Sequence, residues 1–234
     1  MKSVTALLIC LSLILGTAAI AETIMIDSFL TPIGTPDNHL RIWGDQPFQE
    51  WTDIAPAGAI GDRHAWYRGW DFQYPGFDTV NWVTFVDYSS YGNGDGPALN
   101  FGGYDFNHEW AFDYGIGNPL DLNLAAGYAF SIDLYSSDIP MGNPMTVTVQ
   151  TGTGEGSYTV TVPYWDDYAN PVQLMFPFEL FSGTPDWSDI DVITLNFYSA
   201  DEFGPDAFFD TFVAHTQVVA TEEVSWGSVK SLYR

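Results

Sequence analysis

Residues 104–114 read YDFNHEWAFDY, and the alternation within this stretch decides the fold class. The even positions all carry ring side chains: Tyr104, Phe106, His108, Trp110, Phe112 and Tyr114. The odd positions carry small or polar side chains: Asp105, Asn107, Glu109, Ala111 and Asp113. Successive side chains of a β-strand point to opposite faces. The stretch therefore predicts a strand with one face in a hydrophobic core and the other in water.

The same period of two returns along the rest of the chain, between clusters of Gly, Pro, Asn and Asp. It predicts further strands at 23–29, 63–72, 79–88, 127–136, 145–151, 157–164, 172–178, 191–199 and 207–214. Residues 152–156 (GTGEG) predict a tight hairpin, residues 184–190 a single helical turn, and residues 92–103 a connecting loop. Together these segments predict an all-β fold, a two-sheet antiparallel β-sandwich of the jelly-roll type.

The two ends of the chain differ from this pattern. Residues 1–21 combine Lys2, an apolar run and a small-residue cleavage site, which predicts a secretory signal peptide, with a retained anchor as the alternative. Residues 22–216 then form a single domain, and residues 217–234 a polar linker with a short tail, WGSVKSLYR. The tail is either a frayed terminus or a sorting or attachment signal. We expect a secreted or cell-surface protein with no integral membrane segment after signal cleavage.

The charge balance limits the possible partners. The chain has 6 basic and 30 acidic side chains, and its net charge is −24. Such a surface repels nucleic acid and anionic membranes, and it attracts cations such as calcium. The single cysteine lies within the predicted signal peptide, so the mature chain has no disulfide.

No catalytic motif is evident. The sequence has no Gly-x-Ser-x-Gly elbow, and its four histidines lack zinc-site spacing. Same-face carboxylates such as Asp105, Glu109 and Asp113 are four residues apart, which is about 13 Å along a strand and too far for a glycosidase pair. We therefore expect a protein that is not an enzyme. An acid pair assembled across strands remains the alternative.

Calcium is the one cofactor that the sequence supports. Calcium binds six to eight oxygen ligands, often from carboxylates. Asp27 lies on the first predicted strand, and Asp206 and Asp210 accompany the last one, with Asp201 and Glu202 nearby. If the first and last strands are neighbours, these carboxylates meet. The alternative is a set of solvated acids.

Aromatic side chains in loops are candidates for a sugar platform, because a flat ring stacks on the apolar face of a pyranose. Trp51, Trp165 and Tyr168 lie in predicted loops. They are therefore predicted ligand-binding residues.

The stretch GDRHAWYRGW (61–70) carries two of the few basic residues. Alternation places Arg63 on one face of its strand and Arg68 on the other, so the two arginines cannot form one cationic clamp. We expect each arginine to pair with a carboxylate and so to fix the strand in the sheet. Arg68 shares its face with Trp66 and Trp70, and these three are also predicted ligand-binding residues.

The order of segments resembles a group of uncharacterised exported bacterial β-sandwich proteins of the C-terminally sorted (PEP-CTERM-like) type. The resemblance rests on IDSF, AIGDRHAWYR, GNGDGPALNFGGYDF, TVTVQTGTGEGSYTVTVP and FFDTFVA, and it spans most of residues 24–214. The chain departs from that type because WGSVKSLYR stands where a membrane segment and an arginine cluster would be. A looser resemblance is to galactose-binding-like and carbohydrate-binding jelly rolls. Both resemblances imply an extracellular β-sandwich.

Three functions follow. The first is a non-catalytic binding or structural module whose partner is a glycan or other cell-surface polymer, with calcium as a structural ion. The second is a carbohydrate-active enzyme with a cross-strand acid pair. The third is a purely structural envelope or matrix protein. The oligomeric state stays open.

Overall fold

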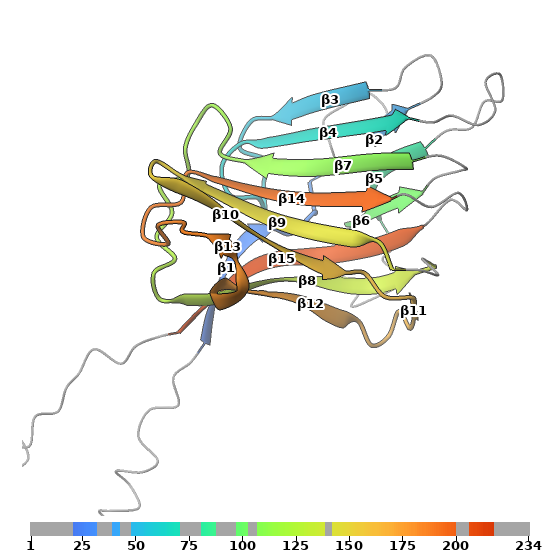
Figure 1. Ribbon diagram of the computed structural model, residues 1–234. Coiled ribbons are helices and arrows are strands. Elements are labelled where there is room, and N and C mark those ends of the chain that lie inside the picture. The colour runs from blue at the N-terminus through green and yellow to red at the C-terminus, as the bar shows by residue number, and fades with distance from the viewer. Residues whose placement is uncertain are drawn as a thin grey trace, which may run out of the picture.

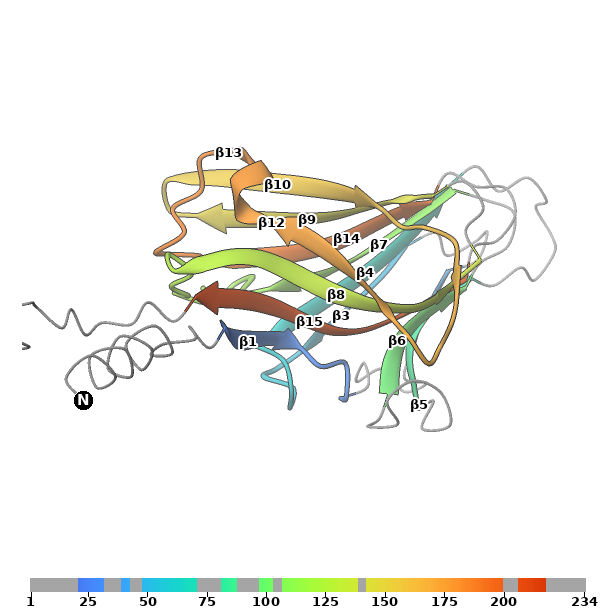
Figure 2. The same cartoon turned by 90° about the horizontal axis from the view of Figure 1, so that it is seen from below.

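The structure is a computed structural model. It describes residues 21–31, 39–42, 48–70, 81–87, 97–102, 107–138, 142–199 and 206–217. Two antiparallel sheets pack face to face, and they are seen as separate layers in Figure 2. The predicted two-sheet antiparallel sandwich is confirmed.

One sheet has eight strands in the order β11-β8-β15-β6-β5-β2, with β1 beside β15 and β12 beside β8. Its strands are β1 (Ala21–Asp27), β2 (His39–Ile42), β5 (Asn81–Asp87), β6 (Pro97–Gly102), β8 (Gly127–Ser137), β11 (Trp165–Asp166), β12 (Val172–Pro177) and β15 (Ala207–Gln217).

The other sheet has seven strands in the order β13-β10-β9-β14-β7-β4-β3, and Figure 1 shows most of them stacked from bottom to top. Its strands are β3 (Phe48–Asp53), β4 (Arg63–Trp70), β7 (Asn107–Tyr114), β9 (Pro144–Thr151), β10 (Gly154–Thr161), β13 (Ser182–Gly183) and β14 (Val192–Ser199). A 3₁₀ turn, η1 (Phe178–Leu180), follows β12.

The chain passes repeatedly from one sheet to the other, as in a jelly roll. The first and last strands lie side by side, because β1 pairs with β15 from Ala21 opposite Gln217 to Asp27 opposite Phe212. The start of β1 and the end of β15 therefore lie at the same end of the sandwich (Figure 1).

The core lies between the two sheets and follows the alternation of the sequence. Trp110, Phe112 and Tyr114 of β7 are fully buried and face the interior together with His108. Trp110 stacks on Phe197 of the neighbouring strand β14, with ring centroids 5.5 Å apart. The ring-bearing face predicted for residues 108–114 is thus the core face, whereas residues 104–106 lie outside the described part of the chain.

Three local predictions are wrong. Residues 97–102 form strand β6 and residues 48–53 form strand β3, although both were predicted as loops. The helical turn lies at Phe178–Leu180 instead of 184–190. Strand β6 pairs with β15, which lies more than 100 residues further along the chain, and β3 is stabilised by its pairing with β4, so local composition does not reveal either strand.

The outward face of β7 is also less exposed than alternation predicts. Ala111 and Asp113 point away from the core, yet both are buried. Strands β4 and β14 flank β7, and Trp66 and Thr194 both donate hydrogen bonds to Asp113. Large side chains from neighbouring strands thus cover part of this face.

Among the described residues, no helix is long and apolar enough to span a membrane.

Candidate functional site

The outward face of β4 carries two tryptophans with an arginine between them. Because side chains alternate along a strand, Trp66, Arg68 and Trp70 all project from the same face of the seven-stranded sheet. The guanidinium carbon of Arg68 lies 5.4 Å from the ring centroid of Trp66 and 5.5 Å from that of Trp70. Both distances are within the range of cation–π attraction, so the arginine links the two indoles.

Glu109 of β7 holds this arginine in place. The Nε of Arg68 donates to Oε2 of Glu109 over 2.7 Å, and a terminal nitrogen of Arg68 also contacts Oε2. The other oxygen, Oε1, accepts a hydrogen bond of 2.8 Å from the side-chain amide of Asn196 on β14. One carboxylate thus fixes groups from the strands on both sides of β7.

Asp113, four residues further along β7, fixes Trp66 in the same way. Its Oδ2 accepts a 3.1 Å hydrogen bond from the indole N–H of Trp66 and lies 3.2 Å from Nδ1 of His64. Its Oδ1 accepts a 2.6 Å hydrogen bond from the hydroxyl of Thr194. The orientation of the Trp66 indole is therefore set by a carboxylate that is itself buried.

Tyr198 of β14 extends the aromatic surface across β7. Its ring is stacked on that of Trp70, with centroids 5.6 Å apart and planes inclined by 23°. We call Trp66, Arg68, Trp70 and Tyr198 the outer platform. All four are at least partly exposed, and they lie over the hydrogen-bonding groups of Glu109, Asp113 and Asn196.

Hydroxyl side chains continue the same face beyond β14. Alternation and strand pairing place Thr194 beside Thr148 of β9 and Thr148 beside Ser157 of β10. Thr146 and Thr159 form a second such pair, with their hydroxyls 2.8 Å apart. The outward face of the seven-stranded sheet thus combines aromatic rings with donors and acceptors of hydrogen bonds. Such a surface can stack on apolar C–H faces and bind hydroxyl groups at the same time.

The inward face of the same strand holds a different arrangement. Arg63 is fully buried and donates to Oδ2 of Asp27 (3.0 Å), to Oδ2 of Asp53 (2.8 Å) and to the carbonyl of Thr31 (2.9 Å). The hydroxyl of Tyr114 donates to the same oxygen of Asp27 over 2.9 Å. The expectation that Arg63 pairs with a carboxylate is confirmed, and this group joins β1, β3, β4 and β7.

Burial shifts the titration of this buried group. Burial raises the pKa of Asp27, against the opposing effect of the Arg63 charge. Burial also raises the pKa of Tyr114 well above its usual range, and the negative charge of Asp27 adds to this effect. For Arg63, burial acts to lower the pKa, but the charges of Asp27 and Tyr114 together with the hydrogen bonds to Asp53 and Asp27 outweigh it, and the pKa is raised.

The other predicted aromatic ligands lie elsewhere. Trp51 belongs to β3 and pairs with Ala65, so it is on the sheet face opposite to Trp66, and its indole N–H donates to Asp53 over 3.0 Å. Trp165 lies in β11 of the eight-stranded sheet, partly buried against the core. Tyr168 packs edge-on against Phe208 of β15. The structure therefore does not bring these three to the outer platform.

The predicted calcium ligands are not brought together either. Strands β1 and β15 do pair, but Asp27 is bound by Arg63, which already supplies a cation. Asp210 pairs with Asp133 of β8, and the backbone N–H of Asp206 donates to Asp138. Asp201 and Glu202 lie outside the described residues.

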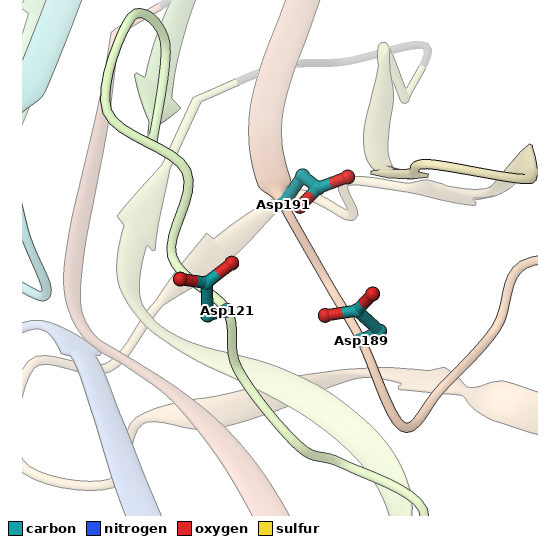
Figure 3. A group of neighbouring side chains, drawn as sticks. All are labelled: Asp121, Asp189 and Asp191. Atoms are coloured by element: carbon teal, nitrogen blue, oxygen red, sulfur yellow. The ribbon is translucent and has the colours of Figure 1, made fainter.

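A different set of acids is close together. One carboxylate oxygen from each of Asp121, Asp189 and Asp191 lies within 4.8 Å of the others, and Figure 3 shows these side chains on two adjacent loops. The loops are joined by backbone hydrogen bonds between Leu122 and Ile190. Of the described residues, these three form the one acidic or histidine group that is compact enough to hold a metal ion.

The outward face of the eight-stranded sheet carries a smaller polar group. The hydroxyl of Ser131 is 2.7 Å from Nε2 of His215, and burial lowers the pKa of this histidine while the charge of Asp133 opposes the shift. Burial likewise raises the pKa of Asp133, which pairs across the sheet with Asp210. Asp210 is only 6% exposed, so its carboxylate offers little surface to a substrate.

Comparison with known proteins yields similarity of fold alone. No protein-family model and no curated protein matches the chain. Among solved structures, a family 11 carbohydrate-binding module of a cellulosomal cellulase of Clostridium thermocellum is 15% identical, with a TM-score of 0.40 over 88% of this chain and 100% of that one. A carbohydrate-binding module of family 29 is 10% identical, with a TM-score of 0.36 over 84% and 90%. Identities and TM-scores this low carry no argument about the ligand.

Sequence reasoning missed the residues that support the outer platform. Glu109 and Asp113 were recognised as outward-facing, but their hydrogen-bond partners Asn196 and Thr194 lie more than 80 residues further along the chain, as does Tyr198, which stacks on Trp70. The alternation along β14 predicts that these three side chains lie on the same sheet face. Only the pairing of β7 with β14 gives their position.

Proposed function

We propose that this protein is an exported, secreted or surface-associated, non-catalytic module that binds a glycan on the outward face of its seven-stranded sheet. The observation that carries the proposal is the outer platform itself. Two indoles and a phenol ring lie on one sheet face, above carboxylate and amide groups whose positions are fixed by hydrogen bonds. Stacking on aromatic rings together with hydrogen bonds to hydroxyls is the chemistry that sugar recognition requires.

Charge favours an uncharged glycan. The platform includes one cation, Arg68, whose charge is already balanced by Glu109. Glu50 and Asp113 add negative charge beside it, on a chain whose net charge is −24. An anionic polysaccharide would be repelled by this surface, whereas a neutral polysaccharide would meet no electrostatic repulsion.

The platform geometry does not favour glycoside hydrolysis. Glu109 and Asp113 lie four residues apart on one strand, about 13 Å, which exceeds the separation used by either class of glycosidase. Both carboxylates are also bound to neighbouring side chains. A binding role therefore fits this face better than the enzyme alternative.

The structural calcium ion and the relation to the C-terminally sorted type stay predictions from the sequence. If calcium binds in the described part of the chain, Asp121, Asp189 and Asp191 have the most suitable placement, since calcium prefers carboxylate oxygens.

The test is affinity electrophoresis of residues 22–234 in gels that contain single polysaccharides. We expect retardation by at least one neutral polymer among β-1,3-1,4-glucan, xylan and galactomannan, and none by alginate or polygalacturonate. Double substitution Trp66→Ala/Trp70→Ala should abolish the retardation, whereas Trp165→Phe in the other sheet should retain it. Retardation that persists in the double variant would refute the platform, and no retardation in any gel would favour a purely structural role.

A further inference from the structure

His64 of β4 lies between two carboxylates beside the outer platform. Its Nδ1 is 3.2 Å from Oδ2 of Asp113, and its Nε2 is 3.3 Å from Oε2 of Glu50. Asp113 belongs to β7 and Glu50 to β3, so the imidazole connects β4 with the strands on both sides. A protonated imidazole donates from both nitrogens, whereas a neutral one has a single N–H and a lone pair. Only the protonated ring can bind both carboxylates at once.

The two carboxylates are held with very different strength. The side chain of Asp113 is 8% exposed and also accepts hydrogen bonds from Trp66 and Thr194. The side chain of Glu50 is 60% exposed, and within the described residues His64 is its one side-chain partner. A neutral ring therefore keeps its N–H on Asp113 and turns its lone pair toward Glu50, which repels that carboxylate into solvent.

When Glu50 is not bound to His64, its position allows it to contact a ligand on the outer platform. It lies directly opposite Trp66 in the β3–β4 ladder and on the same sheet face. A carboxylate beside an aromatic ring can accept hydrogen bonds from the hydroxyls of a sugar that stacks on that ring.

We propose that His64 is a proton-dependent clamp on the outer platform. Protonated, it holds Glu50 against the sheet; neutral, it releases Glu50 to a bound glycan. This inference rests on the proposed glycan-binding function of the platform.

The groups that face the imidazole in the described structure are few. Glu50 comes from β3 and Asp113 from β7, and the next charge on the same face of β4, Arg68, is balanced by Glu109. Histidine is the side chain whose charge ordinarily changes between about pH 5 and 8. Binding should therefore be weaker at the acid end of this range and stronger at the alkaline end.

The first experiment needs no glycan. The imidazole resonances of His64 are followed by NMR from pH 5 to 8 in residues 22–234 and in Glu50→Gln. In the parent we expect the Glu50 carboxyl resonance to shift together with the His64 titration. In Glu50→Gln the Nε2–H of His64 should exchange faster with water at pH 5, because the carboxylate that binds it is lost. An exchange rate of the His64 Nε2–H that is the same in both proteins would overturn the clamp.

The second experiment measures binding of β-1,3-1,4-glucan by calorimetry at pH 5.5 and pH 7.5. We expect about tenfold weaker binding at pH 5.5 in the parent, the size of one hydrogen bond to a charged group. His64→Gln should bind equally at both pH values, whereas the control His215→Gln, on the other sheet, should keep the parent's pH dependence.

The two experiments separate the two proposals. A pH dependence that survives in His64→Gln would overturn the clamp even if the platform binds glucan. A coupled His64–Glu50 titration without glucan binding at either pH would support the clamp and count against the proposed ligand.

Discussion

The two faces of β4 use arginine in opposite ways. Arg63 points inward, is completely buried and is bound by Asp27, Asp53 and a backbone carbonyl. Arg68, five residues later, points outward, is 54% exposed and lies between two indoles with one carboxylate partner. Arginine therefore has a structural role on the inward face of β4, where Arg63 joins the strands, and forms part of the exposed outer platform on the outward face, where Arg68 links the two indoles.

The physical reason for the difference is solvent. A buried charge must be compensated by partners at hydrogen-bond distance, because removing it from water costs several kcal/mol. An exposed charge keeps most of its hydration, and its ion pair contributes little to stability. Substitutions on the inward face should therefore change stability, and substitutions on the outward face should change binding.

The largest expected effect is on the inward face. Arg63→Met removes the cation shared by Asp27 and Asp53 and leaves buried carboxylates uncompensated. We expect a loss of about 3–5 kcal/mol in the free energy of unfolding, measured by urea denaturation. If Arg63→Met unfolds like the parent, the structural role assigned to the inward face is wrong.

A matched variant separates charge from packing in that result. Asp27→Asn/Arg63→Met removes the charge of the carboxylate along with the cation. The double variant should recover part of the stability lost in Arg63→Met, because only Asp53, which is less buried than Asp27, is then left without the cation. A double variant less stable than Arg63→Met would mean that shape, and not charge, dominates at this site.

The next largest effect is on the outward face and concerns binding alone. Trp70→Ala removes one indole and the ring on which Tyr198 stacks. We expect a loss of about 2 kcal/mol in binding free energy toward a bound polysaccharide, close to a 30-fold weaker affinity, since aromatic side chains dominate interface energetics. The unfolding midpoint should change far less than in Arg63→Met. A large loss of stability in Trp70→Ala would show that the two faces are not as distinct as we infer.

Arg68→Met is the direct counterpart of Arg63→Met on the same strand. Because Arg68 is largely solvated, we expect a change of no more than about 1 kcal/mol in the free energy of unfolding. Affinity should fall in the same variant, because the indoles lose the group that links them. Equal destabilisation by Arg68→Met and Arg63→Met would contradict the comparison.

A smaller effect concerns the outward face of the other sheet and its pH dependence. The folded-state pKa of His215 is lowered mainly by burial, so the folded state binds this proton less well than the unfolded state. Its contribution to stability is therefore complete above about pH 6.5 and declines as pH falls through that value. His215→Gln should remove this decline in melting curves between pH 7.5 and pH 5. If the stability of the variant fell more steeply with decreasing pH than that of the parent, the sign that we assign to the contribution of His215 would be wrong.

The smallest effect is expected at the Asp121, Asp189 and Asp191 group, which belongs to neither face of β4. Its carboxylates repel one another, so Asp189→Asn should raise the free energy of unfolding by a few tenths of a kcal/mol in EDTA. If the group holds calcium, the parent should gain about 1 kcal/mol in millimolar calcium and the variant should not. Equal responses of both proteins to calcium would place any calcium site elsewhere.

Much of the fold was predictable because the alternation of apolar and polar side chains is a local feature of the sequence. The ring-bearing face of β7 and the opposite directions of Arg63 and Arg68 follow from side-chain direction along a strand, and the hairpin between β9 and β10 follows from the glycines of residues 152–156. Strands β3 and β6 were missed, because short strands of mixed composition are stabilised by the strands they pair with. Trp51 was misplaced for the same reason.

The sequence predicted the β4 residues of the candidate site but not the residues that orient them. Trp66, Arg68 and Trp70 share a face because they are two residues apart, and the sequence shows this directly. The residues that orient them come from β7 and β14, and the order of strands in the sheet is not encoded in any local pattern. The positions of the predicted calcium ligands also depended on the tertiary structure. The first and last strands are neighbours, but Asp27 binds Arg63 of the other sheet, and its partner in the ladder with β15 is Phe212.

The sequence by itself determined the fold class, the face on which each β4 side chain lies and the opposite directions of the two arginines, because all three depend only on the two-residue period of a strand. Tertiary structure alone decided which carboxylate each arginine meets, that Tyr198 extends the aromatic surface and that His64 lies between Glu50 and Asp113. Except for His64–Glu50, which joins the consecutive strands β3 and β4, these contacts join strands that are far apart in the chain. They exist only once the whole sheet has assembled in one register.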